Sequence, residues 1–161
     1  AEGLPDIPVI GLHFALPEEF DRFEWFGRGE HENYADRKAS AFVGLWQSRV
    51  ADRMVPYLIP QECGNMLDVR RLSIMGRTGG CLTFTGIPTV EANVLPYTPE
   101  EMEIAQHQKD LPVSDKTVVR INYRQTGVGG DDTWSQNARP HEEFRIRAEE
   151  GCHFRFSVKP E

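Results

Sequence analysis

The sequence predicts a mainly β domain of the sandwich type, with one short helix near residues 99–107. Apolar and polar residues alternate along several short runs that glycine and proline bound, which is typical of strands. Only one stretch carries a clear helix start signal. With 161 residues the chain corresponds to a single domain over residues 1–161. A chain of this length buries roughly two-thirds of its unfolded surface, which is enough for a core.

The first two predicted strands lie near the start of the sequence. Residues 7–17 alternate apolar and polar side chains and end at a proline. The phase of the alternation changes once, between Val9 and Ile10, which predicts a β-bulge there. Residues 20–29 repeat the pattern, with aromatic side chains two positions apart and glycines at the end. Both runs therefore predict strands with one buried face.

Two later segments predict hairpins, with a single strand at residues 116–125 between them. Residues 70–76 and 81–87 are alternating runs separated by Arg-Thr-Gly-Gly, a typical hairpin turn. Residues 144–158 predict the second hairpin, with Glu-Glu-Gly as its turn. Its expected inward side chains are Phe144, Ile146, Phe154, Phe156 and Val158.

The predicted helix starts at a capping box. Thr98 stands at the N-cap, Pro99 at the first helical position and Glu101 three residues after the cap. Residues 40–54 are ambiguous. Apolar side chains four apart suit a helix there, whereas a glycine and β-branched valines favour an extended chain.

The composition excludes several classes of function. The net charge is −7 and the pI is about 5.3, so a nucleic-acid partner is not expected. Hydrophobic residues make up 39%, and mean hydropathy is −0.49. No apolar run approaches the ~20 residues that a membrane helix needs. The sequence therefore predicts a soluble protein with no membrane partner.

Known catalytic and metal-binding motifs are absent from the sequence. The three cysteines show no paired spacing, and the five histidines form no HxH or HExxH pattern, so no metal site is predicted. The run Gly127–Gly130 lacks the lysine of a phosphate-binding loop. No GxSxG nucleophile motif occurs.

Residues 126–140 place Trp134 in a run of glycines and polar residues without apolar periodicity. An exposed aromatic ring on such a loop is typical of a platform for a sugar. Burial of Trp134 beneath its own loop is the alternative. The adjacent Asp131 and Asp132 would point to opposite faces of an extended chain, which makes them a poor acid/base pair. A role in the turn is expected for them.

Three motifs carry a resemblance to a known family. Residues 24–37 (EWFGRGEHENYADR), 55–65 (VPYLIPQECGN) and 127–135 (GVGGDDTWS) occur in an order and spacing that resemble the C-terminal, small-chain domain of bacterial β-galactosidases of glycoside hydrolase family 2. The resemblance covers nearly the whole chain. It implies a supersandwich fold, related to galactose mutarotase, of which this chain is a part.

The resemblance also implies a division of labour. The family hydrolyses terminal non-reducing β-D-galactose residues by a retaining mechanism that uses two carboxyl groups. Both catalytic glutamates and the magnesium ligands belong to a barrel domain, so this chain is expected to hold no catalytic residue and no cofactor. Its expected partners are a galactoside substrate, the other domains of the same polypeptide and further copies in a homo-oligomer. The bacterial cytoplasm and the periplasm both remain open as its compartment.

Trp134 matches a family tryptophan that reaches the mouth of the active site and stacks on the substrate. The resemblance implies a supporting loop around it, formed by Gly129, Gly130, Asp131, Asp132 and Ser135. The other two motifs suggest a polar network, with a structural role preferred over contact with sugar. Its candidates are Arg28, Glu32, Tyr34, Asp36, Arg37, Gln61, Glu62 and Asn65. The chain departs from the family at Glu30 and Ala35, where proline is frequent, and at Arg71, where tryptophan is frequent.

Two alternative functions are weighed beside this one. A free-standing carbohydrate-binding module would use Trp134 as its platform. A mutarotase-like epimerase would need a histidine and a carboxylate that converge, for which His31 or His141 with Glu32 or Glu62 are the candidates. Bare sheet edges on a partial sandwich would also lead the isolated chain to associate with itself as a two-fold dimer.

Overall fold

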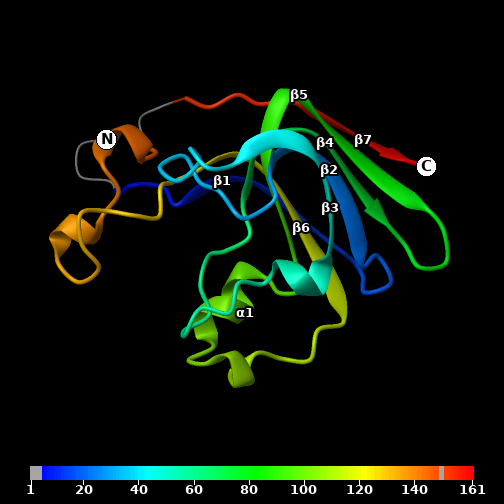
Figure 1. Cartoon of the computed structure of the whole chain (residues 1–161), viewed down its shortest axis with the longest axis horizontal. Helices are drawn as coiled ribbons and strands as arrows, with labels where there is room; N and C mark the ends of the chain where they lie inside the picture. The colour runs from blue at the N-terminus through cyan, green and yellow to red at the C-terminus, as the bar shows by residue number, and fades with distance from the viewer. Residues whose placement is uncertain (1–4, 149–150) are drawn as a thin grey trace.

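The computed structural model describes residues 5–148 and 151–161. The strands in this part of the chain are β1 (Val9–Pro17), β2 (Arg22–Gly29), β3 (Phe42–Arg49), β4 (Met66–Met75), β5 (Cys81–Leu95), β6 (Lys116–Gln125) and β7 (Phe156–Pro160). Together they form one sheet of seven strands in the order β1-β6-β5-β4-β2-β3, with β7 joined to β5 (Figure 1). Every pairing is antiparallel. The predicted mainly β class is therefore confirmed.

Most predicted strands are found where the alternation places them. β6 covers residues 116–125, and the predicted hairpin between β4 and β5 is present. The register of β1 on β6 shifts between Ile10 and Gly11, one residue after the predicted change of phase. The ambiguous residues 40–54 form β3 and then a short 3-10 helix, η1 (Val50–Arg53). The extended alternative for this segment was therefore correct.

The long strand β5 takes part in two different pairings. Its first part, Leu82–Gly86, pairs with β7, and its second part, Glu91–Leu95, pairs with β6. The ring centroids of Phe14 on β1 and Phe84 on β5 lie 5.5 Å apart, although β6 stands between these strands in the sheet order. The sheet therefore curves around one of its faces, and that face encloses the main core.

The main core forms because alternate residues of each strand point to that face. On β2, Phe23 and Trp25 are almost fully buried, while Phe26 on the other face is 41% exposed. Burial of each large apolar side chain stabilises the fold by about 1.5–3 kcal/mol. The remaining buried members are Val50, Met66, Val69, Leu72, Ile74, Phe84, Val90, Ala92, Val94, Val119 and Ile121.

A second, smaller cluster lies between the sheet and the α-helix α1 (Pro99–Ile104), which Figure 1 shows below the strands. Cys63, Leu95 and Met102 are its buried members. The capping box at Thr98 and Glu101 is present as predicted. The helix ends at Ile104, earlier than the predicted 107, and the backbone of Ala105 is already extended.

The predicted hairpin over residues 144–158 is wrong. Phe144 ends a short 3-10 helix, η4 (Glu142–Phe144), and the described strand β7 pairs with β5 instead of with that segment. Ile146 is buried, as expected for an inward side chain, but Val158 is 41% exposed. Residues 149–150 of the expected turn lie outside the described residues.

Aromatic packing accounts for this different pairing. The Phe156 ring on β7 lies 6.5 Å from Phe84 and 6.4 Å from Phe14, centroid to centroid. The first part of β5 offers a free edge on that side of the sheet, so β7 both completes the edge and covers the core. Alternation along a sequence predicts a strand and its apolar face, but it leaves the partner strand undetermined.

Candidate functional site

Trp134 lies on the segment of residues 126–141, called the Trp134 loop below. In Figure 1 this segment, yellow to orange, extends from the end of β6 away from the sheet. The Trp134 side chain is 88% exposed, whereas Trp25 in the core is 1% exposed. Of the two possibilities for Trp134, the structure therefore has the exposed one.

Asp132 organises the tip of the loop. Its carboxylate accepts hydrogen bonds from the Trp134 amide at 3.0 Å and from the Ser135 amide at 2.9 Å. The Ser135 hydroxyl donates to the same carboxylate at 2.5 Å. The bonds from Ser135, and then the one from the Trp134 amide, hold the pKa of Asp132 below its usual range. Asp132 therefore acts as an ionised anchor for the backbone that carries the indole.

Gly130 allows the loop to close on itself. A Cβ atom at this position would lie 2.1 Å from the Asn137 carbonyl oxygen, a separation that no side chain tolerates. The next amide, that of Asp131, donates to the same Asn137 oxygen at 2.8 Å. The Asp131 carboxylate also lies 2.9 Å from His141 Nε2, at the far end of the loop. A larger residue at Gly130 would break this closure.

The root of the loop is attached to a different part of the chain. Asp36 Oδ2 accepts hydrogen bonds from the amides of Val128 and Gly129, each at 2.8 Å. The Gly127 amide donates to the Phe144 carbonyl at 2.9 Å and so joins the start of the loop to the segment that follows it. A cavity of about 350 Å³ lies beside this attachment, lined by Asp36, Arg37, Val128, Gly129, Gly130, Asp131, His141 and Phe144.

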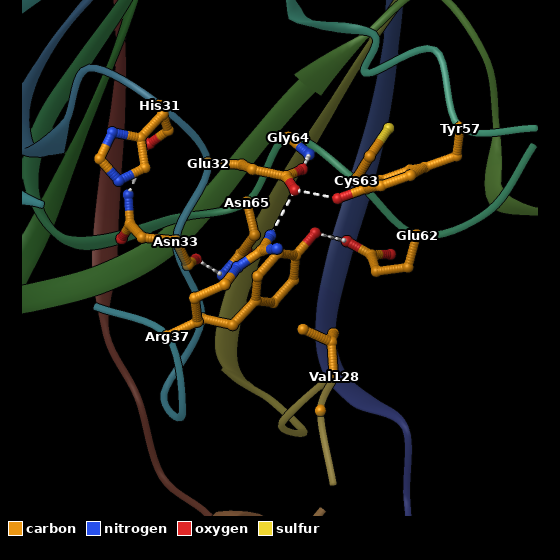
Figure 2. Close-up of polar contacts among 12 residues, drawn as sticks. His31, Glu32, Asn33, Arg37, Tyr57, Glu62, Cys63, Gly64, Asn65 and Val128 are labelled. Carbon is orange, nitrogen blue, oxygen red and sulfur yellow. Dashed lines mark hydrogen bonds and ion pairs between the residues drawn. The ribbon is translucent and has the colours of Figure 1, made fainter. Parts of the chain in front are cut away.

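The first two motifs meet in a partly buried group of polar residues. We call it the carboxylate cluster, and it consists of Glu32, Tyr34, Arg37, Tyr57, Glu62 and Arg120. Figure 2 shows the Glu32 carboxylate between Gly64, Tyr57 and Arg37. It accepts from the Gly64 amide at 2.7 Å and from the Tyr57 hydroxyl at 2.5 Å, and it pairs with Arg37. Glu32 is thereby tied to both motif segments.

Glu62 forms the other half of the cluster. Arg120 on β6 donates to both of its carboxylate oxygens, at 2.8 and 2.7 Å. Burial acts to lower the pKa of Arg120, but the adjacent Glu62 outweighs it and the pKa is raised. The Tyr34 hydroxyl donates to Glu62 at 3.2 Å, and burial, followed by the nearby Glu62, raises the pKa of Tyr34. Tyr34 therefore stays a neutral donor, and Arg120 stays charged.

The other candidates for the polar network lie outside the carboxylate cluster. Arg28 donates to Asp68 at 2.6 Å and to the Ala41 carbonyl at 2.8 Å. The Gln61 amide donates to the Ile59 carbonyl, its own near neighbour. Asn65 donates to the Asn33 carbonyl at 3.1 Å and so joins the first two motifs at a second point.

Glu91 on β5 is an ionisable group that the sequence motifs did not indicate. Its carboxylate accepts hydrogen bonds from the backbone amide of Gln125 at 2.9 Å and from the side-chain amide of Asn65 at 3.3 Å. Burial raises the pKa of Glu91 to about 7, although both hydrogen bonds act to lower it.

Arg120 and Arg53 were also missed, and one of them had a usable signal. Arg120 stands in Val-Val-Arg-Ile-Asn, where apolar residues on both sides suggest a strand that is buried on both faces. A charge there requires a partner. Arg53 donates to the Glu30 carbonyl at 2.7 Å and to the Gly64 carbonyl at 3.1 Å, contacts that no local pattern encodes.

The histidine–carboxylate pairs considered for an epimerase are not formed. His31 contacts Ser40 at 3.1 Å, and His141 contacts Asp131. Glu32 and Glu62 are engaged by the arginine and tyrosine partners described above. Over residues 5–148 and 151–161, no group of three or more His, Cys, Asp or Glu side chains is placed to hold a metal ion. In the same residues, no helix combines the length and apolarity needed to cross a membrane.

Comparisons with known proteins agree with this architecture. A family model described as "Beta galactosidase small chain" matches residues 1–158. A protein named Beta-galactosidase from Priestia megaterium is 45% identical over 160 residues, which are 99% of this chain and 15% of that protein. Proteins of the same name from Halalkalibacterium halodurans and Streptococcus thermophilus are 36% and 35% identical, each over 98% of this chain and 15% of their own length. The chain thus spans about 15% of the length of these curated relatives.

Proposed function

This chain belongs to the β-galactosidase small-chain family, and from that premise we propose that the polypeptide that carries it is a β-galactosidase. It hydrolyses terminal non-reducing β-D-galactose residues, as in lactose, by the retaining mechanism of two carboxyl groups about 5 Å apart. Both catalytic glutamates and the magnesium ligands lie outside this chain. The chain packs on the catalytic barrel and completes the rim of the active site through Trp134.

The exposure of Trp134 is the observation that carries this proposal. The indole is 88% exposed at the tip of a loop whose backbone is fixed by Asp132. The flat apolar face of an indole suits the C–H face of a pyranose, and few rotatable bonds have to be frozen on contact. A large aromatic ring that is held in solvent by its own loop is suited to contact a ligand.

The carboxylate cluster supports the fold instead of the chemistry. A retaining glycosidase needs one free nucleophilic carboxylate and one carboxylic acid that can give up its proton. Glu62 is held by two bonds from Arg120, and Glu32 is held by Arg37, Tyr57 and a backbone amide. Neither group is available for such a role, which supports the placement of the catalytic pair elsewhere in the polypeptide.

Hydrolysis of a chromogenic β-galactoside tests the proposal. In the full polypeptide, Trp134→Ala is expected to raise KM about fivefold, because an aromatic contact of this kind contributes about 1 kcal/mol. The purified 161-residue chain is expected to show no turnover. Turnover by that chain that falls with Trp134→Ala would mean that it carries its own catalytic carboxylates. An unchanged KM in the full-length variant would remove Trp134 from the rim.

The same exposed indole also favours a second candidate, a carbohydrate-binding module that acts without a catalytic domain. Titration calorimetry of the isolated chain with galactose and with lactose separates the two. Heat that Trp134→Ala abolishes would support the binding module. No heat with either sugar, together with a raised KM in the full-length variant, would support the rim.

We also propose that the protein associates with further copies of itself. β3 forms one edge of the described sheet, and its side chains Phe42 and Leu45 are 73% and 60% exposed. A bare edge with exposed apolar side chains favours pairing, and a two-fold dimer is the simplest closed arrangement. Light scattering of the isolated chain should give the mass of a dimer, and Phe42→Lys should shift it toward the monomer. A monomeric mass at high concentration would contradict this proposal.

A further inference from the structure

The attachment of the Trp134 loop to Asp36 joins parts of the chain that are 92 and 93 residues apart. One carboxylate oxygen accepts from two successive backbone amides, those of Val128 and Gly129, each at 2.8 Å. Hydrogen bonds from amides to an ionised carboxylate are about twice as strong as bonds between neutral groups. The direction in which the loop leaves the sheet therefore depends on the position of this side chain.

Gly127 is fitted to the same carboxylate. A Cβ atom on Gly127 would lie 2.6 Å from Asp36 Oδ2 and 2.9 Å from the Phe144 side chain, so one of the two would have to move. The same atom on Gly129 would lie 3.7 Å from Asp36, an ordinary contact. The root of the loop thus has room for the Asp36 carboxylate only because residue 127 has no side chain.

Asp36 is itself held from both sides. Tyr34 and Arg37 form a bridge in which each backbone amide donates to the other residue's carbonyl, at 3.2 and 2.8 Å. The Tyr34 side chain donates to Glu62, and the Arg37 side chain pairs with Glu32, as Figure 2 shows for Arg37. Asp36 lies between them in the sequence, so the rigid cluster determines where its carboxylate points.

The bonds at the tip of the loop give it a shape but not a place. The bonds to Asp132 come from residues two and three positions away. The contact between Asp131 and His141 joins two parts of the same loop. These bonds would persist if the whole loop swung about its root. The orientation of the loop is therefore set at its root, where the amides of Thr126 and Gly127 donate to the Pro8 and Phe144 carbonyls. Asp36 is the only side chain among these acceptors, and it holds the two amides nearest the tip.

We propose that Asp36 is a positioning residue for Trp134, which transmits the rigidity of the carboxylate cluster to the loop and sets where the indole meets the substrate. The attachment of the loop stands on the contacts above, and its effect on substrate rests on the proposed function of Trp134. Asp36 touches no reacting atom in this proposal and acts only through the loop.

Amide hydrogen exchange and kinetics of the full polypeptide test this role together. Asp36→Ala should speed exchange of a peptide that covers residues 126–135 by about tenfold, because two amides lose a charged acceptor. Asp36→Asn keeps a neutral acceptor and should give a smaller increase. Gly127→Ala should reproduce the effect by displacing the carboxylate. Gly129→Ala adds the same methyl group without a clash and should leave the exchange of this peptide, corrected for intrinsic rates, unchanged.

The kinetic arm uses two backgrounds. Asp36→Ala should raise KM for a chromogenic β-galactoside about as much as Trp134→Ala, roughly fivefold. The same substitution in the Trp134→Ala background should add no further increase, because Asp36 acts through the indole. Circular dichroism of each variant checks the fold. If Asp36→Ala fails to fold, Asp36→Asn and Gly127→Ala provide both measurements.

Each outcome has a distinct meaning. Exchange that stays at the wild-type rate in Asp36→Ala would overturn the attachment of the loop. Faster exchange with an unchanged KM, in an enzyme whose KM responds to Trp134→Ala, would overturn the positioning role. Equal increases in KM in both backgrounds would also overturn it, since Asp36 would then act by another route. An unchanged KM in Trp134→Ala itself would instead overturn the proposed function of the indole.

Discussion

The carboxylate cluster and the Trp134 loop both depend on carboxylates that hold backbone or side-chain donors, yet they differ in the range and burial of those bonds. In the cluster, Glu62 binds Arg120 across 58 residues, and the arginine side chain is 6% exposed. In the loop, Asp132 binds neighbours two and three residues away through bonds at the exposed surface. Long-range buried bonds stabilise a fold, while local exposed bonds shape a surface. Substitutions in the two regions should therefore have different consequences.

The largest effect is expected where the buried ion pair is broken. Glu62→Ala leaves the Arg120 guanidinium buried without its partner and also removes the acceptor of the Tyr34 hydroxyl. Loss of one member of such a pair destabilises a protein by about 3–5 kcal/mol. Denaturant unfolding of the chain measures this loss of free energy of unfolding.

Gln61→Ala is the matched control for that substitution. Gln61 precedes Glu62 in the chain, is exposed and makes its hydrogen bond to the nearby Ile59 carbonyl. Its removal should change the free energy of unfolding by less than about 0.5 kcal/mol. Equal effects of the two substitutions would mean that the ion pair does not distinguish the cluster from the surface around it.

The sequence predicted those features of the fold that local patterns determine. The strand of residues 116–125 and the capping box at Thr98 follow from alternation and from cap chemistry within a few residues. The partner of β7 did not follow, because the choice between β5 and the segment after Phe144 depends on aromatic packing between distant residues. Strands and helix caps are determined by neighbouring residues, whereas the partner of a strand is determined by the packing of the whole core.

The candidate site divides in the same way. The motif residues Glu32 and Glu62 were recognised as polar network candidates, but their partners Tyr57 and Arg120 were not. A motif shows which residues occur together in a sequence, whereas a buried pair needs the register of a strand far along the chain. The exposure of Trp134 stayed open for the same reason. It depends on the bonds to Asp132 and on the close approach of Gly130 to the Asn137 carbonyl in three dimensions.

Glu91 on β5 and Asp132 in the Trp134 loop should respond to pH in opposite directions, and Glu91 gives the next largest effect. Burial raises the pKa of Glu91 from 4.5 to about 7 in the folded state. Below pH 4.5 both the folded and the unfolded states keep the proton, so its stabilisation is fully present there. As the pH rises from 4.5 to about 7 the unfolded state releases the proton first, and stability falls by about 3 kcal/mol.

Glu91→Gln isolates this contribution. The introduced glutamine side chain keeps an oxygen that accepts from the backbone amide of Gln125, but it has no proton to release. The decrease in stability between pH 4.5 and 7 should therefore disappear. Asp132 has the opposite sign. Its pKa is lowered by the bonds from Ser135 and Trp134, so its contribution is present at neutral pH and is lost as the pH falls through the folded pKa. A wild-type chain whose stability is flat between pH 4.5 and 7 would contradict the burial of the Glu91 carboxyl.

A small effect on stability is expected at the residue that is proposed to contact the substrate. Trp134→Ala removes a side chain that is 88% exposed, so the free energy of unfolding should change by less than about 0.5 kcal/mol. Trp25→Phe, which trims a ring that is 1% exposed and packs on Phe23, should destabilise the chain more. Denaturant unfolding of both variants gives their effects on stability, and the KM of the full-length variants gives their effects on substrate. Together the two measurements distinguish a residue that contacts substrate from one that supports the fold. If Trp134→Ala destabilised the chain as much as Trp25→Phe does, the exposed indole would be part of the packing, and its loop could not be regarded as a surface built for a ligand.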